Sequence, residues 1–440
     1  MLRLHTTRAR LATMALALAL VLASAAAVLL APTAPQAVAA ETSAEQKPTY
    51  TVQEGPTFNT AIGDQSSRRA ILDLILQTIR HTSPKGQIKI MTWNFMNAGA
   101  ADALIQRAQK GTTVRVLIDA NNNDEDTDNP SFRRLKKGLK ATNGKNEKGA
   151  TKSFARMCRG SCRGKSGAAH TKMFLFDKVG LSRNVLIQGS ANLTTAAAAN
   201  QWNEVYTYVG RDKIYDFAEK IFDQMWRDKV TKNAYREFEG NRYSLYFSPY
   251  YGKYFEKDPV QETMDRIKCK GARKAGNANG RTIVRSAPDV IRGKRGMIAA
   301  RRLKTLWDQG CDVRIAYTVM GRDVKKHLNG GGGRGPVPMK HLVQDFDGDG
   351  DFDNYFHLKV LTINGRIGAD RTSYVTFNGS ANTSDAASRS DEQTGKLVGR
   401  RNTLLYQRFI DRWFENPPPN AGRRADADPN IAPYQHVDMD

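Results

Sequence analysis

Apolar positions along the chain alternate between a helical period and short, continuously apolar runs. Residues 71–79 follow the helical period, and residues 87–95 then read as a strand. Residues 100–121 repeat this order, because a helical pattern stops at Gly111 and an apolar strand begins at Val114. Helices that alternate with strands predict an α/β fold in which helices cover a mixed sheet.

The second half of the chain repeats the first. Residues 298–320 match residues 100–121, with a stop at Gly310 and a strand from Val313, 199 residues after Val114. The tripeptide HTK at 170–172 returns as HLK at 357–359, and GSAN at 189–192 returns unchanged at 379–382. Three features in the same order predict a duplication. We therefore expect two homologous α/β half-domains, packed pseudo-symmetrically, each a mixed sheet flanked by helices.

Composition suggests where the halves begin and end. Residues 50–245 form the first half and residues 246–415 the second, closed by helices at 213–226 and 409–414. The aromatic-rich segment 241–258 joins them. Residues 416–440 carry five prolines, three of them consecutive at 417–419, and few apolar residues, which predicts a disordered tail.

The beginning of the chain predicts export. Arg3, Arg8 and Arg10 precede an apolar stretch at 11–31, and AVA at 37–39 offers a cleavage site. A membrane anchor is the alternative, because about 20 apolar residues span a bilayer. The alanine-rich stretch and the small residues that follow favour a signal peptide at 1–39 and a secreted protein.

The net charge and the cysteines are compatible with a secreted protein. The net charge is +23, and an excess of cations attracts nucleic acid, anionic lipid surfaces or wall polymers, although it also serves solubility alone. Four cysteines permit three disulfide pairings. One disulfide in each half is favoured, Cys158–Cys162 and Cys269–Cys311. Zinc is disfavoured because no second close Cys or His pair accompanies Cys158 and Cys162.

The repeated tripeptide has a chemical logic. Residues two apart on a strand project to the same face, so His170 and Lys172 point together, one able to attack phosphorus and the other to hold phosphate charge. After a strand at 184–188, the turn of Gly189, Ser190 and Asn192 offers hydroxyl, amide and backbone donors to the same oxygens. The second copy consists of His357, Lys359, Gly379, Ser380 and Asn382.

The pattern H-x-K-x4-D with a downstream G-S-x-N resembles the signature of the phospholipase D superfamily, and the whole chain resembles the secreted bacterial phospholipases D. The first copy, HTKMFLFD, ends in Asp177 as the signature does. The second, HLKVLTIN, ends in Asn364, where the family usually has aspartate. The family's aspartate is structural, so this departure concerns local packing more than catalysis.

The resemblance implies a mechanism. One histidine attacks phosphorus and carries a phosphohistidine, while the other protonates the leaving oxygen and then activates water or an alcohol. We assign His170 as the nucleophile and His357 as the acid and base. The resemblance implies that Lys172 and Lys359, with Ser190, Asn192, Ser380 and Asn382, stabilise the phosphoryl oxygens. Four cationic groups can replace a metal, so no cofactor is expected in the reaction.

A histidine nucleophile needs an acceptor on its other ring nitrogen. Glu204 lies 34 residues after His170, and Glu392 lies 35 after His357, which matches the family's downstream acid in each half. An ordinary surface glutamate is the alternative. Trp93 and Asn94, at the end of an early strand, either line the pocket or serve packing alone.

Two further segments carry charge. Acids alternate with other residues before His357, in the manner of an EF-hand-like calcium loop with glycine at position 6. Position 12 is Phe356, so the bidentate glutamate is missing, and an acidic turn is the alternative to a structural calcium site. The five acids are Asp345, Asp347, Asp349, Asp351 and Asp353. Basic residues at 156–165 read as a rim for an anionic substrate or as a solvated loop.

The motif defines a reaction class and leaves the substrate open. The first interpretation is a monomeric secreted phospholipase D that releases or exchanges a phospholipid headgroup at an anionic membrane surface. Secretion, two motifs in one chain and the aromatic linker favour it. The second is a secreted, metal-independent nuclease of the same superfamily. The third is a catalytically degenerate protein that binds anionic surfaces, for which Asn364 is the support.

Overall fold

The computed structural model describes residues 49–125, 127–145, 151–250, 257–347 and 351–419. All of them belong to one compact unit, Pro48–Asp440. The predicted signal peptide and residues 420–440 of the predicted tail lie outside the described residues. Among the residues that are described, no helix has the length and hydropathy to cross a membrane.

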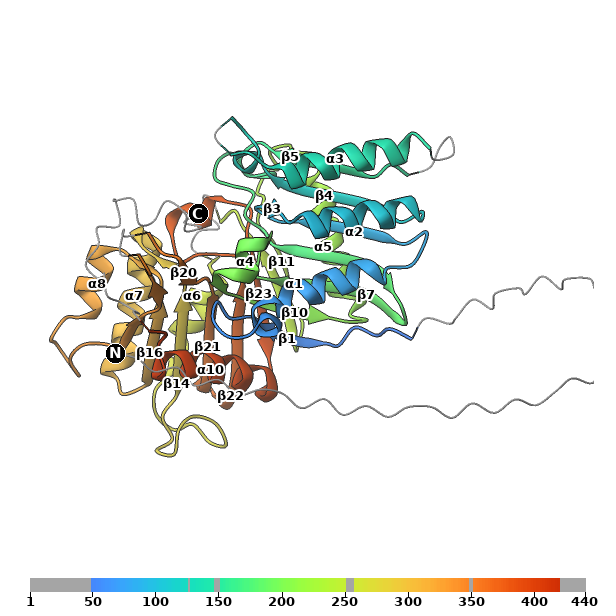
Figure 1. Ribbon diagram of the computed structural model, residues 1–440. Helices are drawn as coiled ribbons and strands as arrows, with labels where there is room; N and C mark the ends of the chain where they lie inside the picture. Colours follow the sequence, from blue (N-terminus) through green and yellow to red (C-terminus); the bar gives the residue numbers. More distant parts are fainter. Residues whose placement is uncertain (1–48, 126, 146–150, 251–256, 348–350, 420–440) are drawn as a thin grey trace, which may run out of the picture. The chain divides into compact units, whose positions relative to one another are not determined.

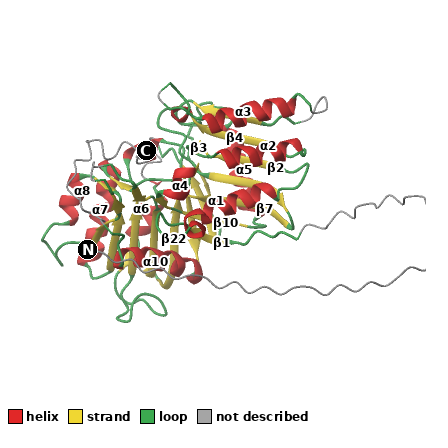
Figure 2. Ribbon diagram, in the orientation of Figure 1, coloured by secondary structure: helices red, strands yellow, loops and turns green. Residues whose placement is uncertain are grey.

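Two mixed sheets form the framework (Figures 1 and 2). The first has the strand order β1 (Gly55–Phe58), β10 (Glu204–Tyr208), β7 (Ser182–Gly189), β6 (Met173–Val179), β2 (Gln87–Met91), β4 (Thr113–Asp119) and β5 (Phe154–Cys158). The second has the order β11 (Arg236–Phe238), β12 (Tyr243–Phe247), β23 (Gln393–Val398), β22 (Asp370–Gly379), β21 (Lys359–Ile367), β14 (Ile283–Pro288), β16 (Asp312–Tyr317) and β18 (Met339–His341), with β13 (Ile267–Lys268) beside β21.

The two sheets have the same topology, which confirms the predicted pair of α/β halves. In each, a central strand pairs with one parallel and one antiparallel neighbour, β4 and β6 around β2, and β16 and β21 around β14. The next strands outward, β7 and β10 or β22 and β23, are antiparallel. By sheet membership the second half begins at β11, so the expected boundary between residues 245 and 246 falls inside β12.

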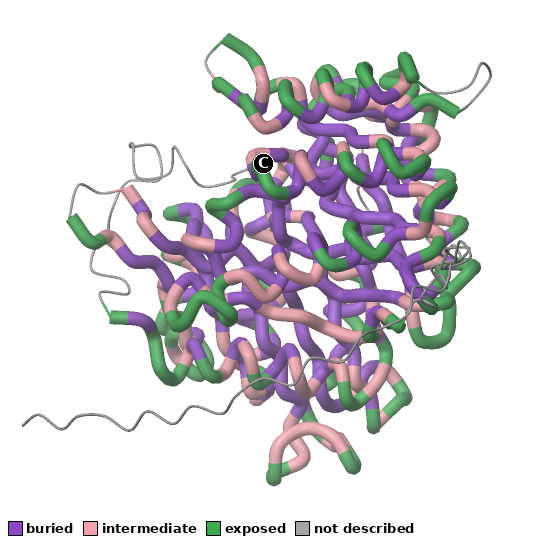
Figure 3. The backbone as a smooth tube through the Cα atoms, turned by 45° about the vertical axis from the view of Figure 1, so that its right-hand side comes forward, coloured by how far each residue is buried: buried purple, intermediate pink, exposed green. Residues whose placement is uncertain are grey.

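Helices cover the outer faces of both sheets and fill the space between them. The first core lies between its sheet and three helices, α1 (Gln65–Arg80), α2 (Ala98–Gln109) and α3 (Pro130–Asn143). The second core joins residues of both sheets to α5 (Asp212–Met225) and α10 (Arg400–Glu415). The third lies between the second sheet and α6 (Pro259–Asp265), α7 (Gly293–Asp308) and α8 (Arg322–Leu328). Figure 3 shows the buried residues gathered in the interior of the tube, with exposed residues at its periphery.

Short strands and turns complete the halves near the two His-x-Lys motifs. The small sheets are β3 (Phe95–Met96) with β8 (Leu193–Thr194), β15 (Val290–Ile291) with β17 (Val319–Met320), and β19 (Val343–Gln344) with β20 (Asn354–Phe356) and β9 (Gln201–Trp202). Three short elements are the 3₁₀ turn at Ala120–Asn122, α4 (Thr195–Ala199) and α9 (Asp385–Arg389). The strand expected at 87–95 is thus divided, with β2 ending at Met91. Because β20 is parallel to β9, a strand of the second half that directly precedes His357 is hydrogen-bonded to the first half.

Both predicted disulfides are present, Cys158–Cys162 and Cys269–Cys311. Gly111 and Gly310, where the two helical patterns were expected to stop, have φ of +91° and +89°. Only glycine adopts such a backbone readily, so these two turns end α2 and α7 in the same way.

Candidate functional site

The two motif tripeptides precede equivalent strands, β6 and β21. His170 and Lys172 lie just before β6, and Lys359 opens β21. The side chains of His170, Lys172 and His357 are completely buried, and Lys359 is nearly so. The expected pairing of histidine with lysine is close in the first copy, where Lys172 Nζ lies 2.6 Å from His170 Nε2.

Each histidine contacts a residue of the opposite half. His170 Nδ1 lies 2.8 Å from Glu392 Oε2, 222 positions along the chain. His357 Nδ1 lies 2.7 Å from Asn203 Oδ1, 154 positions away. The backbone follows the same rule, since His170 N–H donates to Asp391 O and His357 N–H donates to Trp202 O. Residues of both halves therefore form the site, which lies at the interface between them.

The matched sequence offsets suggested that Glu204 and Glu392 occupy equivalent positions, and the strand register shows that they do not. Gly189 pairs with Val205, whereas Gly379 pairs with Thr394. The first half thus has one extra residue between its Gly-Ser-x-Asn turn and the next strand. Consequently Asn203 is the counterpart of Glu392, and Glu204 is the counterpart of Gln393.

Glu204 lies in a different hydrogen-bond network. Its Oε2 accepts from Tyr406 OH at 2.6 Å and from Asn378 Nδ2 at 2.8 Å, both in the second half. Burial raises the pKa of Glu204 to about 7, against the lowering effects of Tyr406, Asn378 and Lys359. Gln393, its counterpart, holds the first motif through its amide, which accepts from Lys172 N–H and donates to Lys172 O and Gly189 O.

The serines of the two turns contact these same orienting residues. Ser190 Oγ donates to Asn203 Oδ1 at 2.9 Å, and Ser380 Oγ donates to Glu392 Oε2. A hydroxyl expected on the phosphate is thus engaged in positioning a histidine partner. The glycines are explained by close strand packing, because a Cβ at Gly189 would lie 2.2 Å from Glu204 O and one at Gly379 would lie 2.3 Å from Gln393 O.

The two asparagines of these turns hold the loops that border the site. Asn192 Oδ1 accepts from Asn94 N–H and from Thr92 Oγ1, both at 3.4 Å. The carbonyl oxygen of Asn382 accepts from the Arg295 guanidinium.

Trp93 lies beside the first histidine. Its ring lies 5.8 Å from the His170 ring in an edge-on arrangement, and Lys172 Nζ lies 5.8 Å from its centroid. In the second half the corresponding residue is Asp289, because Trp93 O and Asp289 O accept from Asp119 N–H and Thr318 N–H at matching positions.

Asp289 is a site residue that sequence reasoning missed. Its Oδ2 lies 3.0 Å from Lys359 Nζ and 3.8 Å from His357 Nε2, and its side chain is completely buried. The sequence could have indicated Asp289 only by its position directly after the strand at 283–288, which matches the position of Trp93 after the strand of the first copy. The two side chains differ in chemistry, so the presence of Trp93 did not predict a carboxylate at the matching position.

The last residues of the two motifs have structural contacts. Asp177 Oδ1 accepts from Gln87 N–H at 2.7 Å, where β2 begins. Asn364 Oδ1 accepts from Gly276 N–H at 2.8 Å, and its amide donates to Gln407 on α10. Both residues therefore bind a neighbouring segment, although the two segments differ, since Asp177 binds the first residue of β2 and Asn364 binds Gly276.

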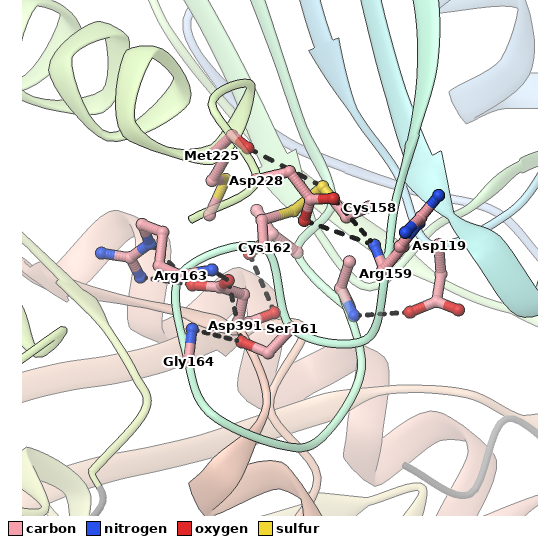
Figure 4. Close-up of a disulfide and its surroundings, with 12 residues drawn as sticks. Asp119, Cys158, Arg159, Ser161, Cys162, Arg163, Gly164, Met225, Asp228 and Asp391 are labelled. Carbon is pink, nitrogen blue, oxygen red and sulfur yellow. Dashed lines mark hydrogen bonds and ion pairs between the residues drawn. A yellow bond between two sulfur atoms is a disulfide. The ribbon is translucent and has the colours of Figure 1, made fainter. Parts of the chain in front are cut away.

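Arg163 fits neither interpretation of the basic loop at 156–165, a rim for an anionic substrate or a solvated loop. It is completely buried and bonds the Asp391 carboxylate through Nε at 2.7 Å and through a terminal nitrogen at 2.6 Å (Figure 4). Ser161 Oγ and Arg163 N–H also donate to Asp391 Oδ2. The loop closed by Cys158–Cys162 therefore anchors the residue next to Glu392.

Three of the five acids of the predicted calcium loop lie close together. Carboxylate oxygens of Asp345, Asp347 and Asp353 lie within 4.8 Å of one another, and Asp353 Oδ2 also accepts from Phe346 N–H. Asp351 is half-buried, and Asp349 lies outside the described residues. Calcium takes six to eight oxygens, so three carboxylates supply part of a shell, and a calcium site stays a prediction.

One family model matches part of the chain. Residues 75–226 match a family model described as "Cardiolipin synthase, PLD-like domain". No curated protein matches the sequence significantly.

Three solved structures are similar to the chain. Phosphatidylserine synthase from Haemophilus influenzae has a TM-score of 0.51 at 12% identity, over 83% of this chain and 86% of that one. Polyphosphate kinase from Porphyromonas gingivalis has a TM-score of 0.52 at 11% identity, over 82% of this chain and 50% of the kinase. This chain thus spans about half of the kinase. Nuc from Salmonella typhimurium, a phospholipase D family member, is 18% identical over 39% of this chain and 95% of its own length, with a TM-score of 0.30. At these identities the likeness to the synthase and the kinase shows the fold alone, and the family match shows a phospholipase D-like domain within residues 75–226.

Proposed function

We propose that the chain is a secreted phospholipase D-type phosphodiesterase that hydrolyses the headgroup phosphodiester of a phospholipid through a phosphohistidine on His170. The observation that carries the proposal is the unequal pairing of the two histidines, His170 with the Glu392 carboxylate and His357 with the Asn203 amide. A nuclease of the same superfamily is the alternative, and the test below separates the two.

The hydrogen bonds support His170 as the nucleophile. A proton on Nδ1 donates to Glu392 and leaves Nε2 unprotonated. Lys172 donates to Nε2 in this structure, so the Nε2 lone pair becomes available for attack once Lys172 turns to the phosphate oxygens. The Glu392 carboxylate also stabilises the positive charge that the ring gains when the nitrogen–phosphorus bond forms.

The surroundings of His357 support the acid role. Asn203 Oδ1 accepts from its Nδ1, since the Asn203 amide nitrogen itself donates to Gln201 and Ala197. Asp289 faces Nε2 and favours a proton there. His357 then donates this proton to the leaving alcohol as the phosphorus–oxygen bond breaks.

The second step restores the enzyme. His357 takes a proton from water, the resulting hydroxide attacks phosphorus, and the nitrogen–phosphorus bond to His170 breaks. Lys172 and Lys359 bind the non-bridging oxygens in both steps. Another alcohol in place of water would give transphosphatidylation. Two lysines supply the positive charge, so we expect turnover to survive a chelator unless calcium supports the loop at 345–353.

The test combines substrate choice with trapping of the intermediate. Purified protein is offered phosphatidylcholine vesicles and single-stranded DNA in parallel, with chelator, and His357→Ala and His170→Ala are treated identically. Headgroup release, with phosphohistidine accumulating in His357→Ala and absent in His170→Ala, is the expected result. DNA cleavage with intact lipid would establish the nuclease, and phosphohistidine in His170→Ala would reverse the two roles.

A further inference from the structure

A basic hairpin lies at the edge of the second sheet remote from the catalytic motif. Residues 266–281 contain six cations and no acid. The hairpin includes β13, which pairs with the far end of β21 at Arg366 and Ile367. Since β21 starts at Lys359, about seven residues of strand, or roughly 23 Å, separate the catalytic lysine from this edge. The hairpin is the yellow loop that projects beyond β14 in Figure 1.

The hairpin is held in a defined conformation. Cys269 is linked to Cys311, and Ala272 N–H donates to Gly280 O at 3.1 Å. Two neighbours outside the hairpin add further bonds, because Gly276 N–H donates to Asn364 and Tyr374 OH donates to Lys274 O. Its charges are therefore presented by a pre-ordered backbone.

Two guanidinium groups meet at Gly271. A Cβ placed on this glycine would lie 2.9 Å from a terminal nitrogen of Arg371 and 3.4 Å from one of Arg366. These nitrogens are thus at most 6.3 Å apart (2.9 plus 3.4). The backbone of Arg273 lies beside that of Arg371, since its N–H donates to Arg371 O. The pKa of Arg371 is lowered by desolvation and then by the charges of Arg273 and Arg366.

The arginines are oriented by neutral partners. Arg371 Nε donates to Gly271 O at 2.6 Å, and Arg366 Nε donates to Gly368 O at 3.1 Å. Among the described residues, no ion pair links either of them or Arg273 to an acid. The nearby Asp370 accepts from Thr372 and Ser373, which lower its pKa. Three like charges are therefore gathered without a carboxylate to balance them.

We propose that Arg273, Arg366 and Arg371 form a phosphate-binding site that docks the protein on the headgroups of an anionic phospholipid bilayer. Guanidinium forks match phosphate geometry, and a bound phosphate relieves the repulsion among the three. Further cations surround the site and suit a surface that carries many anions: Arg266, Lys268, Lys270, Lys274 and Arg281.

The composition of the hairpin favours a lipid surface over single-stranded nucleic acid. Residues 266–281 contain no aromatic side chain on which a base could stack. None of the exposed large apolar residues that the structure describes belongs to residues 266–281. Electrostatic attraction to the headgroups, rather than insertion of apolar side chains into the bilayer, therefore accounts for the docking. This site goes beyond the proposed reaction and does not depend on it.

The test measures binding without turnover. The unit Pro48–Asp440, carrying His170→Ala, is sedimented with phosphatidylcholine vesicles that contain about 30 mol % phosphatidylglycerol. Changing Arg273, Arg366 and Arg371 to glutamine is expected to weaken binding roughly a hundredfold, and the same three changes to lysine roughly tenfold. The matched control, Arg68→Gln with Arg80→Gln and Arg183→Gln, removes three exposed charges of the first half and should stay within about threefold.

Separate arms distinguish the source of the phosphate. Inorganic phosphate and a single-stranded oligonucleotide are titrated into the same proteins, whose melting temperatures verify folding. Unchanged vesicle binding in the glutamine variant would overturn the proposal. So would an effect confined to inorganic phosphate, which would leave a free-anion site, or to the oligonucleotide, which would make the hairpin a nucleic-acid contact. Because the His170→Ala protein is inactive under the proposed mechanism, failure here is independent of failure of the reaction.

Discussion

At the scale of single residues, two nearly identical motifs are made chemically different by their neighbours. Glu392 faces His170 where Asn203 faces His357, and Asp289 stands where the first half has Trp93. A carboxylate and an amide of similar size hold a ring equally well and stabilise its positive charge very differently. In the proposed mechanism, these positions divide the nucleophile and acid roles.

An isosteric substitution tests whether the Glu392 carboxylate orients His170 and stabilises its positive charge. Glu392→Gln is expected to lower kcat roughly 10²- to 10⁴-fold with little change in KM, because the amide no longer stabilises the charged ring in the transition state. Steady-state headgroup release would measure this, with Glu262→Gln on exposed α6 as the charge control. Wild-type kcat in Glu392→Gln would remove the orienting role.

Asp289 has a pH-dependent prediction. His357 must start protonated, so activity falls on the alkaline side as that proton is lost. Asp289→Asn removes a negative charge 3.8 Å from His357 Nε2, and we expect the alkaline limb of the kcat profile to move to lower pH. The acidic limb should stay in place. An unmoved alkaline limb would leave Asp289 as a partner of Lys359 alone.

At the scale of elements, the loop between β5 and β6 is a structural clamp. The Cys158–Cys162 disulfide closes its start, and Arg163 then crosses to Asp391 in the second half. The remaining guanidinium bonds go to Ala234 O and Ser248 O, so all of the charge is compensated inside the protein. This loop couples the first motif to the strand that carries Glu392.

Removing the clamp is expected to destabilise the protein. Arg163→Ala leaves the buried Asp391 carboxylate without its cation, which costs about 3–5 kcal/mol of unfolding free energy. Arg159→Ala, on the same loop but exposed, is the matched control and should cost under about 0.5 kcal/mol. Urea unfolding of both variants decides the point, and equal midpoints would show that Arg163 is not a clamp.

At the scale of the whole molecule, a buried ionisable network joins the halves. Glu204 of the first sheet binds Asn378 and Tyr406 of the second half, and its pKa is raised to about 7 by burial. The unfolded chain releases this proton near pH 4.5, the ordinary value. Between these values the folded state binds more protons, so rising pH lowers stability.

A stability profile tests this linkage. The contribution of Glu204 is fully present below about pH 4.5 and is lost by about pH 7, a change of about 3 kcal/mol. Glu204→Gln keeps an acceptor for Tyr406 and cannot ionise, so its melting temperature should depend less on pH across this window. Parallel profiles for the variant and the wild type would be inconsistent with an elevated Glu204 pKa.

Much of the fold was readable from the sequence because it depends on short-range patterns. Apolar periods, the stops at Gly111 and Gly310 and the repeated motifs predicted two α/β halves. The cysteine spacing favoured the disulfide pairs that form. The candidate histidines and lysines were found because two copies of one motif share their spacing.

Tertiary structure decided which side chains meet. One extra residue before β10 moves Asn203, rather than Glu204, into the place equivalent to Glu392, and sequence offsets cannot reveal strand register. Likewise, the burial of Arg163 and the approach of Asp289 to His357 depend on segments more than 60 positions apart. Sequence by itself determined the elements and the reacting groups, since local spacing encodes them. Only packing of the two halves determined their partners, because hydrogen bonds and charge depend on three-dimensional distance.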